Sequence, residues 1–171
     1  MKHIFLYLAC VTLALASFDN ISSFQADFTQ SVTDDKKKVL SYSGTVIASK
    51  PQNAVWKYIK PINKLVYINS YKVTIIEPEI EQAIVKRIES NFDFFNMIKN
   101  AKMITKDVYI AKYKNSEFTI MTENKLIKSI AYIDEFENSV QVVFENQEQN
   151  EKIDEKIFIP HIPIEFDIVR D

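Results

Sequence analysis

Alternation of apolar and polar residues with a period of two is the feature that most constrains the possible folds of this chain, because it recurs along most of the length. Short clusters of turn residues separate the alternating runs. The predicted strands are 24–33, 40–49, 54–59, 64–69, 72–77, 82–88, 108–113, 117–122, 127–134 and 139–147. Such short spacing favours an antiparallel sheet over a parallel one, so the expected fold is mainly β.

Helical signals are few, and one of them is informative. An open sheet of about ten strands tends to curl, which predicts an incomplete, half-open antiparallel barrel whose inward residues surround a hydrophobic cavity. A short helix is expected at 17–23, and a second at 91–99 with Ser90 as its cap. The second helix carries large apolar residues on one face, so it must cover apolar surface. It either fills the core of the sheet or forms a lid over a ligand cavity.

The start of the chain has the pattern of a secretion signal. The run from Ile4 to Ala16 is apolar and ends in a small-x-small motif. It is shorter than the roughly 20 residues of a membrane-spanning helix. We expect residues 1–16 to be a cleaved signal peptide and residues 17–171 to be one soluble domain. Cys10 follows Tyr7-Leu8-Ala9, a poor lipidation context, so we expect it to be removed with the signal.

Composition argues against an enzyme and against nucleic-acid binding. The net charge is −2, and Gly44 is the only glycine, so glycine-rich phosphate loops are absent from the sequence. After signal cleavage the chain would keep one histidine, His161, and no cysteine. Glu77, Glu79 and Glu81 are interpreted as a solvated turn and not as paired catalytic carboxylates. We therefore expect no cofactor and no metal.

Several stretches, taken in order, resemble one family. They are Ser22-Ser-Phe24-x3-Phe28-Thr-Gln30, Gly44-Thr-Val46, Lys50-Pro51-x4-Trp56-Lys-Tyr58-x2-Pro61, residues 73–83, and Lys156-Ile-Phe158-Ile-Pro160 with Ile168-Val169. Together with the signal peptide they resemble the periplasmic lipoprotein carriers of Gram-negative bacteria, the LolA family. Two departures stand out, since Lys50 replaces an arginine of the family and 69–72 replaces an Asp-Gly turn.

The resemblance implies a periplasmic chaperone. It would bind the acyl chains of triacylated lipoproteins, accept them from an inner-membrane ATP-driven release complex, and carry them to the outer membrane as a monomer. Whether a dedicated outer-membrane receptor takes the cargo stays open. From alternation and helical spacing, the expected cavity lining is Phe24, Phe28, Trp56, Tyr58, Phe92, Phe95 and Met97. Lys50 either contacts the lid and assists release, as the family arginine does, or is a solvated lysine at a strand end.

Two other functions stay open at this point. One is a lipid-anchored outer-membrane receptor of the same fold, which would require acylation of Cys10. The other is a periplasmic sensor or peptide-binding regulator with a filled interior. The chemical state of the mature N-terminus distinguishes the first from the carrier, and the presence of bound lipid distinguishes the second.

Overall fold

The computed structural model describes residues 18–87 and 93–170, and within them twelve strands form a single sheet. The strands are β1 (Ser23–Thr33), β2 (Val39–Ser49), β3 (Asn53–Lys60), β4 (Lys64–Asn69), β5 (Lys72–Glu77), β6 (Gln82–Arg87), β7 (Lys102–Thr105), β8 (Val108–Tyr113), β9 (Ser116–Glu123), β10 (Leu126–Ile133), β11 (Ser139–Gln149) and β12 (Asp167–Arg170). One α-helix, α1 (Phe94–Lys99), and three 3-10 turns, η1 (Phe18–Asn20), η2 (Pro78–Ile80) and η3 (Glu155–Phe158), accompany them.

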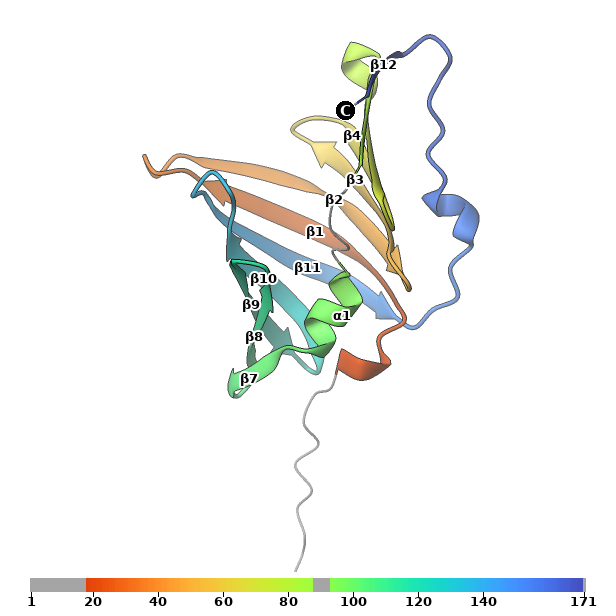
Figure 1. Ribbon diagram of the computed structural model, residues 1–171. Helices are drawn as coiled ribbons and strands as arrows, with labels where there is room; N and C mark the ends of the chain where they lie inside the picture. The colour runs from red at the N-terminus through yellow and green to blue at the C-terminus, as the bar shows by residue number, and fades with distance from the viewer. Residues whose placement is uncertain (1–17, 88–92, 171) are drawn as a thin grey trace, which may run out of the picture.

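The strand order places the first strand in the centre of the sheet. The order is β12-β6-β5-β4-β3-β2-β1-β11-β10-β9-β8-β7, so β1 lies between β2 and β11 (Figure 1). Neighbouring strands are antiparallel except for β12, which pairs in parallel with β6. β7 and β12 are free edges, so the sheet does not close. The prediction of a half-open, mainly β fold is confirmed, with β12 as a parallel exception.

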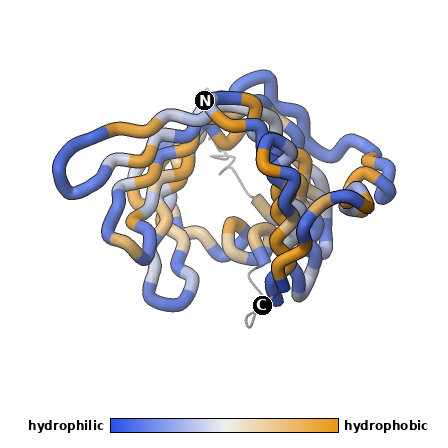
Figure 2. Tube along the Cα trace, turned by 90° about the horizontal axis from the view of Figure 1, so that it is seen from above, coloured by the Kyte–Doolittle hydropathy of each residue, from blue (hydrophilic) through white to orange (hydrophobic). Residues whose placement is uncertain are grey.

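The sheet is strongly curved, and its main core lies on the concave side. Figure 2 shows, from above, two walls of strands joined along one side. In β1 the even-numbered residues Phe24, Ala26 and Phe28 are buried, whereas Asp27 and Thr29 are exposed. This is the alternation expected of a strand with one covered face. Residues of β8 to β11 complete the same buried cluster.

A second, smaller core lies on the convex face. Cross-strand pairing puts Val55 and Thr74 on the face opposite the main core, and both are buried. The chain after β11 runs along the outside of β3 and β4 through η3 (Figure 1). There Phe158 is 2% exposed, and its carbonyl accepts a hydrogen bond from Asn69 Nδ2 at 3.2 Å. The segment between β11 and β12 therefore acts as an external strap.

Helix α1 is shorter than the sequence predicted. It begins after Asp93, whose carboxylate accepts a hydrogen bond from the Asn96 backbone N–H at 2.9 Å. Asp93 is thus the N-cap, in place of the predicted Ser90, which lies outside the described residues. Phe95, Met97 and Ile98 are buried, as expected for a helix that covers apolar surface. Of the predicted helix at 17–23, the described part forms the single turn η1 and ends where β1 begins, and Ser17 lies outside the described residues.

Candidate functional site

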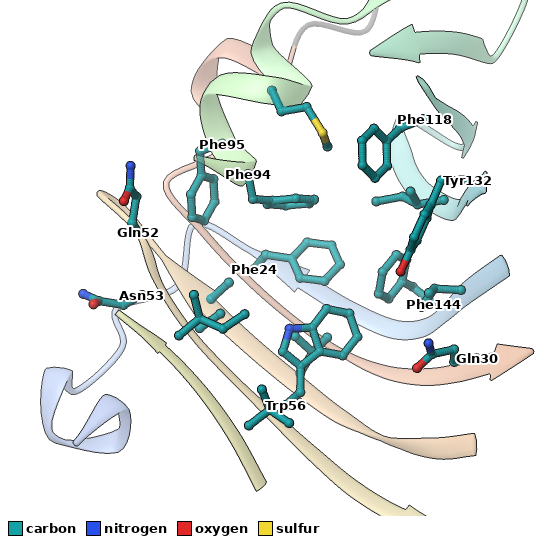
Figure 3. Close-up of a pocket in the computed structure, with 18 of the residues that line it drawn as sticks. Phe24, Gln30, Gln52, Asn53, Trp56, Phe94, Phe95, Phe118, Tyr132 and Phe144 are labelled. Atoms are coloured by element: carbon teal, nitrogen blue, oxygen red, sulfur yellow. The ribbon is translucent and has the colours of Figure 1, made fainter. Parts of the chain in front are cut away.

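An apolar cavity of about 440 Å³ lies between the concave face of the sheet and α1 (Figure 3). Strands from both walls contribute to it, and α1 contributes three side chains. Aromatic residues and one methionine dominate its surface: Phe24, Trp56, Tyr58, Phe94, Phe95, Met97, Tyr113, Phe118, Tyr132 and Phe144. Its volume falls within the roughly 300–1,000 Å³ that is usual for small-molecule sites.

Edge-to-face and tilted ring contacts join the central strands beneath the cavity. Phe24 of β1 packs against Phe144 of β11, with ring centroids 5.1 Å apart and planes at 82°. Trp56 of β3 lies 6.4 Å from Phe144 and 4.9 Å from Phe28, again between ring centroids. Such pairs contribute about 0.5–1.5 kcal/mol each beyond burial alone. The floor of the cavity is therefore a connected aromatic layer held by three strands.

The residues predicted to line a cavity fall into three groups. Phe24, Trp56, Tyr58, Phe95 and Met97 line it. Phe28 does not reach the cavity. It is 3% exposed and packs beside Trp56 and Tyr58, with ring centroids 4.9 and 5.1 Å away. Phe92 lies outside the described residues. The correction for Phe28 is physical, because alternation fixes the face of a strand and not the depth of a side chain within the layer.

Several aromatic residues of the lining were not predicted. Phe118, Tyr132 and Phe144 come from β9, β10 and β11, and Phe94 comes from the first turn of α1. The three strand residues obey the same alternation that identified Phe24. The signal was therefore present in the predicted strands 117–122, 127–134 and 139–147.

Lys50 lies immediately after β2, next to α1. Its Nζ is 5.9 Å from the centroid of the Phe95 ring, at the outer limit of a cation–π contact. Its backbone N–H donates to the carbonyl of Ser22 at 2.9 Å, which fixes the main chain there. The side chain is exposed, so this contact joins strand and helix from the solvent side.

Polar side chains gather at the end of the cavity away from Phe24. The Tyr58 hydroxyl donates to Gln30 Oε1 at 3.0 Å, and Tyr42 packs edge-on to Tyr58 with centroids 6.0 Å apart. Burial raises the pKa of Tyr58 to about 12, and the nearby hydroxyls of Tyr132 and Tyr42 add to this effect. Lys64 Nζ lies 4.8 Å from the Tyr58 ring centroid. The site thus has one aromatic end and one hydroxyl- and amide-bearing end.

The lining of this site favours the binding of apolar ligands. Within residues 18–87 and 93–170, no group of three histidine, cysteine or carboxylate side chains is placed to hold a metal ion. In the same ranges no helix has the length and apolarity needed to cross a membrane. A cavity walled by aromatic rings and a flexible methionine suits apolar ligands of variable shape. The fold and the site define a curved, half-open β-sheet protein that binds apolar ligands.

Comparison with known proteins agrees with this class. Residues 19–116 match the family model described as "Outer membrane lipoprotein carrier protein LolA". An outer-membrane lipoprotein carrier protein of Campylobacter jejuni is 40% identical over 171 residues, covering 99% of this chain and all of the relative. One from Wolinella succinogenes is 32% identical, covering 99% of each. The chain belongs to the LolA family of outer-membrane lipoprotein carriers.

A solved structure also shares the fold. An uncharacterized conserved protein from Thermus thermophilus superposes with a TM-score of 0.55 at 10% identity, covering 90% of this chain and 93% of that one. At that identity the likeness concerns the architecture alone.

Proposed function

We propose that this protein is a periplasmic carrier that binds the acyl chains of lipoproteins released from the inner membrane and delivers them to the outer membrane. The apolar cavity of about 440 Å³ on the concave face is the observation that carries this proposal. Burial of an acyl chain is worth about 0.8 kcal/mol per methylene, so released lipoproteins need an apolar site that keeps their acyl chains out of water. Membership of the carrier family supports the same function.

The cavity volume sets how much lipid it holds in this state. An apolar cavity of about 150 Å³ accommodates one six-carbon benzene ring, so in proportion 440 Å³ accommodates about 18 carbon atoms. That equals one long acyl chain. A cargo with three chains therefore requires the cavity to enlarge, and α1 is the element whose displacement would enlarge it. In this proposal α1 acts as a lid, held over the sheet by Phe95, Met97 and Ile98.

Export of the protein, the source of its cargo and the restraint on α1 complete the proposed function. Residues 1–16 act as a cleaved signal peptide, and residues 17–171 form the carrier domain. An inner-membrane ATP-driven complex supplies the cargo. Lys50 restrains α1 through its contact with Phe95, in place of the family arginine. The regulator with a filled interior is disfavoured because the cavity is open between sheet and helix.

Charged substitutions in the cavity test the proposal. Trp56→Glu and Phe95→Glu would place a carboxylate in an apolar site, where an unpaired charge is strongly unfavourable. We expect each variant to lose binding of a synthetic triacylated lipopeptide, measured by the fluorescence of an added apolar probe because Trp56 is the single tryptophan of the chain, while remaining exported. Ile104→Glu is the matched control, because Ile104 is 62% exposed on the edge strand β7. Normal lipopeptide binding and lipoprotein sorting by both cavity variants would contradict the proposal.

A further inference from the structure

One end of the cavity carries hydrogen-bonding groups on an otherwise apolar surface. Gln30 of β1, Tyr58 of β3 and Tyr132 of β10 all line the cavity. Gln30 lies on the same face of β1 as Phe24, because both are even-numbered in a strand without a bulge on its β2 side. Gln30 lies six residue steps along the strand from Phe24, a distance of about 20 Å. Figure 3 shows Gln30 and Tyr132 together on the side of the cavity away from Phe95.

The two ends of the cavity differ in chemistry. At the β1 start, Phe24, Phe94 and Phe95 present only rings. Gln52 and Asn53 also border that end, but Figure 3 shows their amide groups turned away from the rings, and Asn53 Oδ1 accepts from Asn69 Nδ2 at 3.4 Å. Besides the indole N–H of Trp56 and the hydroxyl of Tyr113, the hydrogen-bonding groups of the lining are therefore those of Gln30, Tyr58 and Tyr132 at the Gln30 end.

This polar end has donors to offer. The Gln30 carbonyl oxygen is occupied by the Tyr58 hydroxyl at 3.0 Å, which orients the amide. Its Nε2 then carries two N–H donors that make no hydrogen bond to the described residues, and the Tyr132 hydroxyl, which lies near that of Tyr58, makes none either. Both side chains are half-buried, so solvent reaches them when the cavity is empty. A ligand that excludes this water must supply acceptors or lose binding free energy.

We propose that Gln30 and Tyr132, with Tyr58 as the orienting residue, bind the ester carbonyl oxygens of a diacylglyceryl group, so that the acyl tails run toward Phe24 and α1. Esters accept hydrogen bonds and donate none, which matches two donor-bearing side chains, Gln30 and Tyr132, on an apolar wall. The assignment rests on the proposed carrier function and specifies the orientation of the bound lipid in the cavity. The peptide part of the cargo leaves at the Gln30 end, and the chain termini lie beneath the helix.

The orientation follows from the order of groups along the cavity. A diacylglyceryl lipid has its carbonyls at one end and methyl groups at the other. The reverse orientation would place the carbonyls against phenylalanine rings and leave the donors of Gln30 and Tyr132 beside methylenes. Each unpaired donor in a ligand-filled cavity would then weaken binding.

Two lipopeptides and one double variant test this assignment. The first lipopeptide has two ester-linked palmitoyl chains on a glyceryl-cysteine, and the second has ether linkages at the same positions. Wild-type protein should bind the ester form about three- to thirtyfold more tightly, as expected for one or two neutral hydrogen bonds. Gln30→Leu/Tyr132→Phe should bind the two forms equally, and the change in this ratio measures the coupling between carbonyl and donor.

The controls separate the failure of this assignment from the failure of the carrier function. Tyr67→Phe removes a tyrosine hydroxyl from the opposite face of β4, paired with Val55, and should keep the wild-type preference. Thermal unfolding verifies that each variant is folded, and Gln30→Asn provides a second variant with the amide withdrawn by one methylene. An equal affinity of wild-type protein for both lipopeptides, or an unchanged preference in the double variant, would overturn the assignment. Absence of binding to either lipopeptide by wild-type protein would overturn the carrier function itself.

Discussion

Gly44 is a position at which a single added methyl group should displace a neighbouring strand. A Cβ built on Gly44 would lie 1.9 Å from the backbone oxygen of Lys57, 2.8 Å from its carbonyl carbon, and 3.0 Å from the Cα of Tyr58. Carbon atoms in contact normally stay about 3.5–4.0 Å apart. All three obstacles are backbone atoms of β3, so no side-chain rotation relieves the clash. Gly44→Ala therefore forces β2 and β3 apart by more than 1 Å at this point.

The expected cost combines two terms. Overpacking costs about 1–3 kcal/mol, and loss of a neighbouring ladder hydrogen bond adds about 1 kcal/mol. We expect the free energy of unfolding to fall by about 3 kcal/mol, with a decrease in Tm of about 6–12 °C for a domain of this size. Tyr58 pairs directly with Gly44, so the shift also moves a cavity residue, and lipopeptide binding should weaken.

Urea unfolding followed by tryptophan fluorescence measures the loss. Ser41→Ala is the matched control, because Ser41 lies on the same strand and is exposed, and it should change stability by less than about 0.5 kcal/mol. A Gly44→Ala variant as stable as the control would refute the reasoning, since it would mean that the two strands separate without cost.

Three further predictions concern other parts of the fold. Phe158→Ala should lower the free energy of unfolding by about 3–5 kcal/mol, since Phe158 is 2% exposed. It should leave lipopeptide affinity unchanged, because the strap lies on the convex face of the sheet. Reduced affinity in a folded variant would contradict this. Tyr58 should make the free energy of unfolding decline at alkaline pH, because its pKa is raised to about 12 in the folded state. Its contribution is fully present below about pH 10 and is lost as the pH rises toward 12. Over that interval the free energy of unfolding of Tyr58→Phe should fall by about 2 kcal/mol less than that of the wild-type protein. Asp93→Ala should cost about 1 kcal/mol locally and speed hydrogen exchange at the Asn96 amide, with no change there counting against the cap.

The sequence predicted most strands because one face of each is covered. The six-residue strands β4, β5 and β8 begin and end at the predicted residues, and the strands of eight to eleven residues differ from prediction by one or two positions at an end. β6 begins at the predicted Gln82, and residue 88 of that prediction lies outside the described residues. β7 was missed because all four of its residues are exposed, so no alternation marks it. β12 was missed because it is a four-residue edge strand whose partner β6 lies far away in the sequence. Pairing that depends on distant residues leaves little local signal.

The candidate site was predicted in part, and its gaps have physical causes. Alternation pointed to the concave face, so Phe24, Trp56 and Tyr58 were named and do line the cavity. Depth within the face depends on which neighbours are large, and Phe28 is covered by the rings of its neighbours. The polar end was not anticipated because Gln30 and Tyr132 are a hundred residues apart in sequence and meet only through the pairing of β1, β11 and β10.

The central position of β1 has a consequence for how the chain acquires its shape. β1 pairs with β11, and Asn146 donates a side-chain hydrogen bond to Asp27, 119 positions earlier. This seam joins the two walls, so neither wall can complete the aromatic floor before residues near 149 are available. Closure across so long a loop is entropically demanding and slow. A chain synthesised from its N-terminus would therefore complete the aromatic floor of its cavity only after residues near 149 had become available, at a late stage of folding.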